Sequence, residues 1–347
     1  MATMRAWQYK TRNEPFESNL SLDTIPRLEA PSTCKSEKDC CILVRVHAVS
    51  INPADHKVPL IPVVGYFLNK KPATPGLDYS GVIEAIPPGT PTTLQVGDKV
   101  LGRLDWPYQR GTLAEYVLAQ PNAIVKLPDS LSFAQGAALG TAAMSGLQPL
   151  EKVNIKPGAS VFINGGSGGV GSYTLQIAKL LGAAHVTVTC GPANVERMKA
   201  LGADEVINYR EADVLDTLKA DAKDKGRFYD IVIENVGAID SLYEQCHHFM
   251  NPAGCFMQVA APFPLFLIKR TILPGFLGGG KRRFASYLTW NDNADFQRLA
   301  DWAGEGKLKT EIDSQFAFED TKEAFERLRG GRCQGKVVVH VVKEGSI

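Results

Sequence analysis

The first third of the chain consists of short apolar runs in which valines and isoleucines alternate with polar residues. The runs are CILVRVHAVSINPAD (41–55), GLDYSGVIEAIPPGT (76–90), VGDKVLGR (96–103) and GTLAEYVLA (111–119). Proline and glycine clusters separate them, as is typical of strands joined by turns. We therefore expect a compact, mostly antiparallel β domain at the start of the chain.

The pattern changes at about Ser132. SFAQGAALGTAAMSGLQPL (132–150) has helical periodicity, and strand-like and helix-like segments then alternate as far as GCFMQVAA (254–261). Strands that alternate with helices of about 10 to 15 residues are typical of βαβ units around a parallel sheet. The centre of the chain is therefore expected to form a doubly wound α/β domain.

Two helical patterns and a final strand, QGKVVVHVV (334–342), follow Trp290. One strand does not close a domain, so we expect this tail to return to the first domain. The predicted domains are residues 1–133 completed by 296–347, and residues 134–295. A chain of 347 residues also exceeds the size at which a single core normally keeps growing.

Composition narrows the functional classes. The chain has 38 lysines and arginines and 37 acidic residues, and this balance predicts no bulk attraction to nucleic acid or to an anionic membrane. The cysteines are odd in number and scattered, which is unlike a disulfide framework and favours reducing surroundings. The apolar segment 263–280 is interrupted by Lys269 and Arg270, so we expect a buried or lid-like loop and helix there and a cytoplasmic protein without a signal peptide or membrane span.

The segment INGGSGGVGSYTLQIAKLLGA (163–183) carries the clearest chemistry. Residues 166–171 match G-x-G-x-x-G, with a predicted strand before the motif and a predicted helix after it. In this context the glycines allow a tight turn, bring backbone N–H groups close to a pyrophosphate and place it at a helix N-terminus. The motif predicts a dinucleotide site; a glycine-rich turn that only packs a helix on a sheet is the alternative.

The end of the next strand indicates which dinucleotide binds. NAD-binding folds usually place an acidic residue about 20 residues after the motif, on the ribose 2′-hydroxyl. Here Thr189, Cys190 and Gly191 follow, and Asn194, Arg197 and Lys199 lie nearby. This loop predicts NADP(H), with Arg197 on the 2′-phosphate; a merely solvated Arg197 is the alternative.

Taken together and in order, the motifs resemble the medium-chain dehydrogenase/reductase superfamily, and within it the zinc-free quinone oxidoreductases and enoyl reductases. The sequence is similar to fungal members of this group, including stand-alone enoyl reductases that act in trans with polyketide synthases. The resemblance covers nearly the whole chain and rests on SINPADHK (50–57), PGLDYSGVIE (75–84), VGDKV (96–100), GTLAEYV (111–117), AALGTAAMSGLQ (137–148), the glycine segment, LGADEVINY (201–209) and QGKVVV (334–339).

The resemblance implies a GroES-like catalytic domain formed by both chain ends, a Rossmann domain between them and a coenzyme in the cleft. Zinc-dependent relatives place a ligand Cys, His and Glu where this chain has Asn52, Leu77 and Asp78. Two of these three cannot bind zinc in the usual way, and residues 90–120, where relatives carry a four-cysteine lobe, contain no cysteine. We therefore expect no metal site, and interpret His47, His56 and the pair 247–248 as structural or surface residues.

The resemblance also implies site residues by position. Asn52, Asp55, Lys57 and Thr141 are the catalytic candidates; Asn52 to Asp55 border the nicotinamide ribose and Thr141 faces the nicotinamide. Tyr66 and Tyr79 are interpreted as packed aromatics, so no essential proton donor is named. The predicted coenzyme contacts are Pro53, Ala54, Gly166, Ser167, Gly168, Gly169, Val170, Gly171, Cys190, Gly191, Asn194, Arg197, Tyr209, Val236, Ala260, Lys336 and Val337.

The leading hypothesis is an NADPH-dependent oxidoreductase that delivers hydride to an activated C=C bond or a quinone without zinc. The variable segments 56–76 and 263–284 predict an apolar pocket for a small conjugated substrate. Three alternatives stay open: a trans-acting enoyl reductase that partners a carrier protein or polyketide synthase, a redox-neutral tailoring enzyme, and a non-catalytic NADPH-binding protein. The strand-like segment 283–290 leaves both a monomer and a homodimer open.

Overall fold

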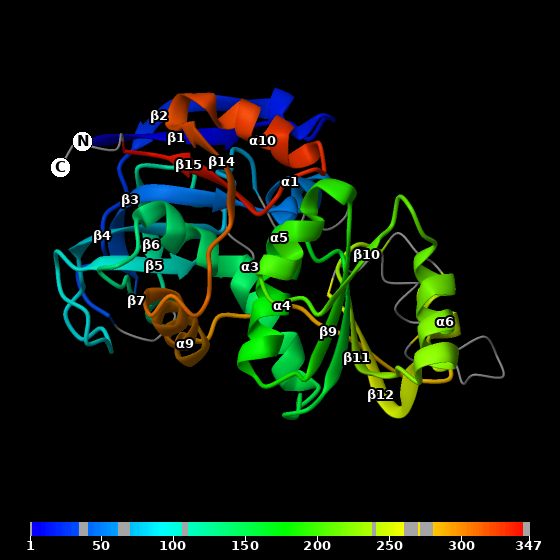
Figure 1. The fold of residues 1–347 in the computed structure, drawn as a ribbon. Coiled ribbons are helices and arrows are strands. Elements are labelled where there is room, and N and C mark those ends of the chain that lie inside the picture. The colour runs from blue at the N-terminus through cyan, green and yellow to red at the C-terminus, as the bar shows by residue number, and fades with distance from the viewer. Residues whose placement is uncertain are drawn as a thin grey trace. The chain divides into compact units, whose positions relative to one another are not determined.

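The computed structural model of the protein describes residues 2–34, 41–61, 70–105, 110–237, 241–259, 270 and 280–342. Contacts divide the chain into two compact units (Figure 1): residues 1–144 with 290–347, called the first unit, and residues 145–289, called the second unit. The predictions for Tyr66 and Ala260, and most of those for the apolar segment 263–280, lie outside the described residues.

The first unit is built on strands. Its strands are β1 (Thr3–Tyr9), β2 (Leu20–Pro26), β3 (Ile42–Ile51), β4 (Asp78–Ala85), β5 (Lys99–Arg103), β6 (Tyr116–Ala119), β7 (Ile124–Lys126), β14 (Ile312–Ala317) and β15 (Lys336–His340). Its helical segments are η1 (Phe16–Asn19), α1 (Pro53–Leu60), η2 (Pro121–Ala123), α3 (Phe133–Lys152, which continues into the second unit), α9 (Asn293–Gly304), η6 (Phe318–Asp320) and α10 (Thr321–Arg329).

Strand β3 organises the larger sheet of this unit, whose order in the described residues is β14-β15-β3-β4-β5-β7. The strand is antiparallel to β4, to β15 at one end and to β6 at the other. Its valines and isoleucines, among them Val44, Val46 and Ile51, are buried in the core of the unit. Because β15 comes from the C-terminal tail and β4 from the first third, β3 brings residues far apart in the sequence together.

Helix α3 is kinked at Gly140, whose backbone angles (φ −29°, ψ −118°) are not helical. A Cβ atom at this position would lie 2.4 Å from the carboxylate of Asp78. Glycine therefore allows Asp78 to approach the helix axis and breaks the hydrogen-bond ladder just before Thr141.

The second unit is an α/β unit with a parallel sheet. Its strands are β8 (Ser160–Asn164), β9 (His185–Cys190), β10 (Glu205–Asn208), β11 (Tyr229–Glu234), β12 (Met250–Gln258) and β13 (Arg283–Ser286). Its helical segments, besides the end of α3, are α4 (Gly169–Leu180), η3 (Pro192–Asn194), α5 (Val195–Ala200), α6 (Val214–Lys225), α7 (Ser241–Gln245) and η4 (Cys246–His248).

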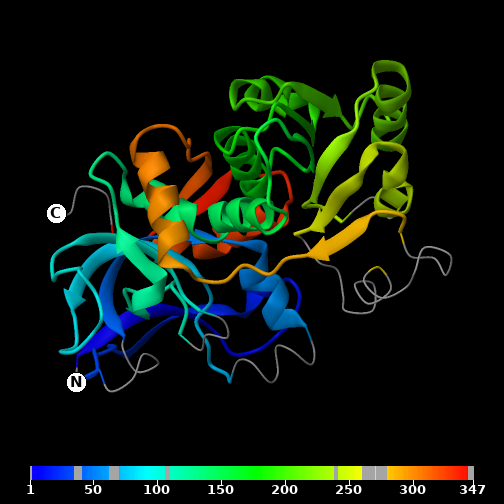
Figure 2. The ribbon, with the colours of Figure 1, turned by 90° about the horizontal axis from the view of Figure 1, so that it is seen from below.

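Described strands of the second unit are all parallel and follow the order β10-β9-β8-β11-β12-β13. Helices α4 and α5 lie on one side of this sheet and α6 on the other (Figure 1 and Figure 2). The order changes direction at β8, so the carboxyl ends of β8, β9 and β11 meet where a doubly wound fold binds its ligand.

The predicted fold class is confirmed: a mostly antiparallel β unit is combined with a doubly wound parallel sheet. Two details were not predicted. The tail contains strand β14, an edge strand parallel to β15 whose residues are half-buried or exposed, so its apolar pattern is weak. Cys34 is disulfide-bonded, which the scattered cysteine spacing did not indicate, whereas Cys190, Cys246, Cys255 and Cys333 are free thiols.

Candidate active site

Asn52 connects β3 to α1 and begins a polar cluster in the first unit. The Asn52 backbone N–H donates to Asp55 Oδ2 at 2.7 Å, and Pro53 starts the helix at a position where its missing N–H costs nothing. Asp55 is completely buried. The sequence N-P-A-D therefore fixes the direction in which the Asn52 side chain leaves the strand.

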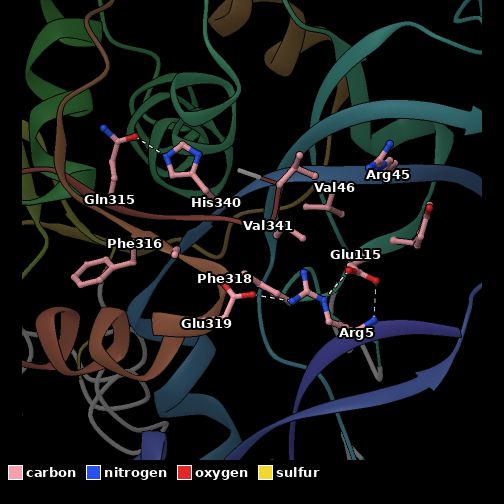
Figure 3. A pocket seen from close by; sticks show the side chains of 13 residues that line it. Arg5, Arg45, Val46, Glu115, Gln315, Phe316, Phe318, Glu319, His340 and Val341 are labelled. Atoms are coloured by element: carbon pink, nitrogen blue, oxygen red, sulfur yellow. Dashed lines mark hydrogen bonds and ion pairs between the residues drawn. The ribbon is translucent and has the colours of Figure 1, made fainter. Parts of the chain in front are cut away.

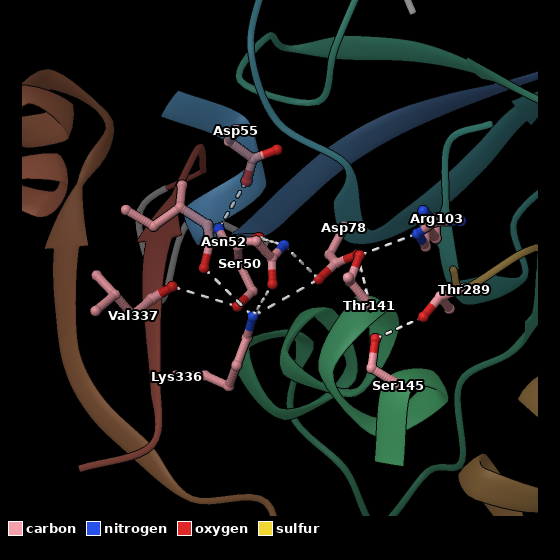
Figure 4. Close-up of polar contacts among 11 residues, drawn as sticks. Ser50, Asn52, Asp55, Asp78, Arg103, Thr141, Ser145, Thr289, Lys336 and Val337 are labelled. Carbon is pink, nitrogen blue, oxygen red and sulfur yellow. Dashed lines mark hydrogen bonds and ion pairs between the residues drawn. The ribbon is translucent and has the colours of Figure 1, made fainter. Parts of the chain in front are cut away.

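Asp78, the first residue of β4, is the hub of this polar cluster (Figure 4). It is completely buried, and its two oxygens accept hydrogen bonds from Asn52 Nδ2 (2.8 Å), Thr141 Oγ1 (2.6 Å) and Thr141 N (2.8 Å). The N–H of Thr141 is free to donate because of the kink at Gly140. Such bonds are required to compensate for the burial of a carboxylate.

Lys336 supplies the positive charge of the cluster from the first position of β15. Its ammonium donates to Asn52 Oδ1 at 2.5 Å and to the Ile51 carbonyl at 3.3 Å, and lies 3.8 Å from Asp78 Oδ2. The residue is only 4% exposed. Burial lowers the pKa of Lys336, and the carboxylates of Asp78 and Asp55 oppose this effect.

A second buried cation, Arg103 at the end of β5, completes the cluster. Its Nε donates to Thr141 Oγ1 at 3.0 Å, and its Nη1 donates to Asn291 Oδ1 at 2.9 Å. The Thr141 hydroxyl thus donates to Asp78 and accepts from Arg103. Arg103 was not among the predicted residues; the available signal is a cation that ends strand β5 (KVLGR) directly after its apolar residues.

The glycine-rich turn of the second unit follows β8 and has no room for a side chain at Gly166 or Gly171. Gly165 has φ +83°, and a Cβ on Gly166 would lie 2.7 Å from Val188. A Cβ on Gly171 would lie 2.0 Å from the Gly165 carbonyl oxygen, whereas Gly168 has open space beside it. The N–H groups in the first turn of α4 therefore border a space that a phosphate can enter.

Arg197, on the short helix α5, links this turn to the loop after β9. Its Nη2 donates to the Ser167 carbonyl at 2.6 Å, and its Nε donates to Asn194 Oδ1 at 3.2 Å. The guanidinium is thus held beside the glycine-rich turn. Cys190, the last residue of β9, is buried, and burial raises the pKa of its thiol.

The remaining predicted residues lie in different surroundings. Lys57 is exposed on α1, and Tyr209 and Val236 are each 53% exposed. Val337 is completely buried in the core of the first unit. Within the first unit the structure brings together Asn52, Asp55, Thr141 and Lys336; within the second unit it brings together the glycine-rich turn, Asn194 and Arg197.

Sequence reasoning missed one further polar group, at the strand ends of the second unit. Asn164, Thr189 and Glu234 are all at least 96% buried. Asn164 Nδ2 donates to Glu234 Oε2 at 2.8 Å, and Thr189 Oγ1 donates to Asn164 Oδ1 at 2.7 Å. The sequence does contain a signal: a polar residue ends an apolar strand, as in VFIN and DIVIE.

A zinc ion does not fit the residues of the first-unit cluster. Leu77 has no donor atom, the Asn52 amide is bound to Lys336 and Asp78, and the Lys336 ammonium already supplies a cation beside Asp78. Among the described residues, no three His, Cys, Asp or Glu side chains gather as a metal site requires.

A hollow of about 890 Å³ opens elsewhere on the first unit (Figure 3). Its charged lining is largely self-paired: Arg5 binds Glu115 at 2.8 Å and Glu319 at 2.7 Å. His340 is hydrogen-bonded to Gln315 at 2.7 Å. None of the predicted site residues lines it, so we do not assign the reaction to this hollow.

Comparison with known proteins agrees with this architecture. The family profile of the alcohol dehydrogenase GroES-like domain matches residues 38–129, and that of the zinc-binding dehydrogenases matches residues 201–339. The chain is 36% identical to the trans-enoyl reductase pgmF of Aspergillus terreus, over 98% of this chain and 97% of the relative. It is 30% identical to the 2-methylene-furan-3-one reductase of Solanum lycopersicum, over 98% of this chain and 79% of that protein.

A solved structure, the quinone oxidoreductase from Coxiella burnetii, superposes with a TM-score of 0.85 at 30% identity and covers 98% of this chain and 100% of its own. The chain belongs to the medium-chain dehydrogenase/reductase superfamily and is an oxidoreductase with a domain for a nicotinamide dinucleotide. Within the superfamily it belongs to the branch of the quinone oxidoreductases and enoyl reductases. Among the described residues, every helix is too short or too polar to cross a bilayer.

Proposed function

We propose that this oxidoreductase uses NADPH to reduce an activated C=C bond, as in an enone or enoyl thioester, or a quinone, and that it does so without zinc. The observation that carries the proposal is the contact of the Lys336 ammonium with Asn52 and Asp78. A lysine is held at the residues that correspond, by resemblance, to the metal ligands of zinc-dependent relatives. Simple alcohol oxidation usually needs a metal to acidify the hydroxyl, whereas a conjugated acceptor does not.

The coenzyme preference follows from the loop after β9. This loop offers no carboxylate before Glu196, and Arg197 is held against the glycine-rich turn by its bond to Ser167. A charge-assisted hydrogen bond is worth roughly 1.5 to 3 kcal/mol, enough for about a tenfold to hundredfold preference for a 2′-phosphate. Bound NADPH supplies the hydride for the reduction.

The buried polar residues Asn52 and Thr141 orient polar groups and do not supply the proton. Both N–H groups of the Asn52 amide are used, by Asp78 and by the Ser50 carbonyl. The Thr141 hydroxyl proton is committed to Asp78. We therefore assign Asn52, Asp55 and Thr141 to orientation, and take the proton from solvent or from the exposed ammonium of Lys57.

Coenzyme binding and turnover test the proposal together. We expect calorimetry to show a clear preference for NADPH over NADH, and NADPH oxidation with a panel of enones, enoyl thioesters and quinones. Arg197→Ala should lower the NADPH to NADH affinity ratio about tenfold or more. Lys199→Ala, an exposed lysine paired with Glu196, is the matched control and should leave the ratio unchanged; equal affinity of the wild type for both coenzymes would contradict the proposal.

A trans-acting enoyl reductase is the second candidate, favoured by the 36% identity to the pgmF protein, whose name describes such an enzyme. On this hypothesis a polyketide substrate arrives on a carrier protein. Efficient reduction of carrier-bound enoyl thioesters with little turnover of free enones would favour it. Coenzyme binding without net NADPH oxidation in either assay would favour a redox-neutral or non-catalytic role.

A further inference from the structure

The network of Thr189, Asn164 and Glu234 connects three neighbouring parallel strands at their carboxyl ends. These residues close or nearly close β9, β8 and β11, and Asn164 lies directly opposite Glu234 in the register of β8 and β11. The side chains are 1%, 4% and 2% exposed, respectively. Such a group is expensive to bury unless each member finds a partner.

Each hydrogen bond of the network has a defined donor and acceptor. The Gly165 N–H donates to Thr189 Oγ1 at 2.8 Å, and the Thr189 hydroxyl donates to Asn164 Oδ1 at 2.7 Å. Asn164 Nδ2 then donates to Glu234 Oε2 at 2.8 Å. The amide orientation of Asn164 is thereby fixed, because a rotated amide would present N–H to the Thr189 hydroxyl and an oxygen to the Glu234 carboxylate.

The other end of the network holds a second backbone turn. Glu234 Oε1 accepts from the N–H groups of Val236 (2.6 Å) and Gly237 (2.8 Å). This turn also abuts the glycine-rich turn, since a Cβ on Gly165 would lie 2.5 Å from the Val236 side chain. One buried carboxylate thus fixes the loop after β11 and, through Asn164 and Thr189, the first residue of the glycine-rich turn.

We propose that Glu234, acting through Asn164 and Thr189, is a positioning residue for the dinucleotide, because it holds both turns in their binding conformation before the coenzyme arrives. The inference rests on the proposed function only in requiring that the second unit binds the coenzyme. If the two turns are already ordered in the free protein, the coenzyme does not lose binding free energy in ordering them. The ordering therefore increases affinity. Among the described residues, the hydrogen bonds that join Thr189, Asn164 and Glu234 involve none of Arg197, Ser167 and Asn194, so we expect the network to act on NADPH and NADH alike.

The central test exchanges the amide and the carboxylate. Glu234→Gln leaves one oxygen for two sides, so its NH₂ group faces either the Asn164 NH₂ or the N–H groups of Val236 and Gly237, and the chain of hydrogen bonds is broken. The double variant Glu234→Gln/Asn164→Asp restores one donor toward one carboxylate and keeps the net charge of the pair. By calorimetry, we expect Glu234→Gln to bind NADPH and NADH about tenfold more weakly than the wild type, by the same factor for both, and the double variant to recover to within about twofold.

Controls separate positioning from loss of stability. Tyr229→Phe removes another buried hydrogen bond of the same sheet, from Tyr229 to Thr187 at 2.9 Å, at the opposite end of β11. It should lower the urea midpoint and leave both coenzyme affinities unchanged. Thr189→Val breaks the network at its other end, and should weaken both coenzymes as Glu234→Gln does, even if Glu234→Gln does not fold.

The outcomes distinguish the two proposals. Wild-type affinity in folded Glu234→Gln or Thr189→Val, or a folded double variant without recovery, would overturn the positioning role and leave the proposed function intact. If Tyr229→Phe lost as much affinity as Glu234→Gln, the network would only stabilise the fold, and the positioning role would be overturned. A wild-type protein that binds neither coenzyme would overturn the proposed function and this inference with it.

Discussion

The Thr141 hydroxyl donates to Asp78 Oδ1 at 2.6 Å, and the Thr141 backbone N–H donates to the same oxygen at 2.8 Å. A carboxylate at the start of strand β4 therefore satisfies the first N–H of the helical segment that follows the kink in α3. Gly140 makes this possible because any larger residue would collide with Asp78. The two bonds tie α3 firmly to the sheet of the first unit.

We expect Thr141→Val to destabilise the protein by about 1 to 3 kcal/mol, because Asp78 loses a charge-assisted donor and Arg103 Nε loses its acceptor. Thr141→Ser keeps the hydroxyl and should cost no more than about 1 kcal/mol for the lost methyl group. Urea unfolding at neutral pH measures both. Equal midpoints for the valine and serine variants would show that the hydroxyl does not bind Asp78 as described.

Removal of the buried ammonium is a second prediction. Lys336→Met leaves the buried carboxylates of Asp78 and Asp55 without this cation, and should cost about 3 to 5 kcal/mol in free energy of unfolding. The matched control is Lys307→Met, which breaks the exposed ion pair with Glu305 and should change stability by less than about 1 kcal/mol. Adding Asp78→Asn to Lys336→Met should recover part of the loss; no recovery would argue against the pairing.

The sequence predicted the two kinds of sheet because their patterns differ: β3 and β4 alternate apolar and polar residues, whereas β8 and β11 are short apolar runs between helices. Asn52, Thr141 and Lys336 were named as candidates only through the resemblance to a family. Nothing in the local pattern around Asp78 shows that residues 52, 141 and 336 meet there. That convergence depends on the register of β15 and β4 on β3, a long-range property.

The missed residues have a common physical reason. Arg103, Asn164 and Glu234 each end a buried strand, and at a strand end a polar side chain is compatible with either solvent or a buried partner. Their partners lie 38, 70 and 70 residues away in the sequence. The strands that carry these residues can be read from the sequence. The order in which the strands pair makes the residues neighbours, and that order depends on the whole sheet.

Two glycines of the same turn separate folding from binding. A Cβ on Gly171 would lie 2.0 Å from the Gly165 carbonyl oxygen, so Gly171→Ala should force the turn open and lower stability by about 1 to 3 kcal/mol. Gly168 has φ −76° and open space around its Cβ position, so Gly168→Ala should leave the urea midpoint unchanged. If the pyrophosphate uses that space, Gly168→Ala will still weaken NADPH in calorimetry; unchanged affinity would place the coenzyme elsewhere.

Metal removal tests the proposed independence from zinc. Because Leu77 offers no donor and the Lys336 ammonium repels a divalent ion, dialysis against a strong chelator should leave NADPH oxidation unchanged. Elemental analysis of the purified protein should find zinc far below stoichiometry. A zinc-dependent alcohol dehydrogenase treated in parallel provides the control. A stoichiometric zinc ion whose removal abolishes activity would contradict the proposal.

The last prediction concerns acid stability and rests on two buried histidines of the first unit. Burial lowers the pKa of His56 to about 4, with Lys57 and Arg329 adding to the effect and Glu17 opposing it. Burial, with Arg45 and Lys99, likewise lowers the pKa of His47 to about 4. His56 is only 8% exposed, and among the described residues its Nδ1 has no hydrogen-bond partner, so the folded state favours the neutral ring.

An unfolded histidine titrates near pH 6.5, so between about pH 6.5 and pH 4 the unfolded chain binds more protons than the folded one, and stability falls as the pH falls. Each histidine contributes at most about 3 kcal/mol to this loss. Urea unfolding between about pH 7 and pH 4.5 should therefore show a shallower loss for His56→Gln than for the wild type. His248→Gln, at an exposed position, should retain the wild-type slope. Since protonation of carboxylates contributes equally to all three proteins, a difference between the two variants isolates His56, and parallel curves would mean that its ring is protonated in the folded state.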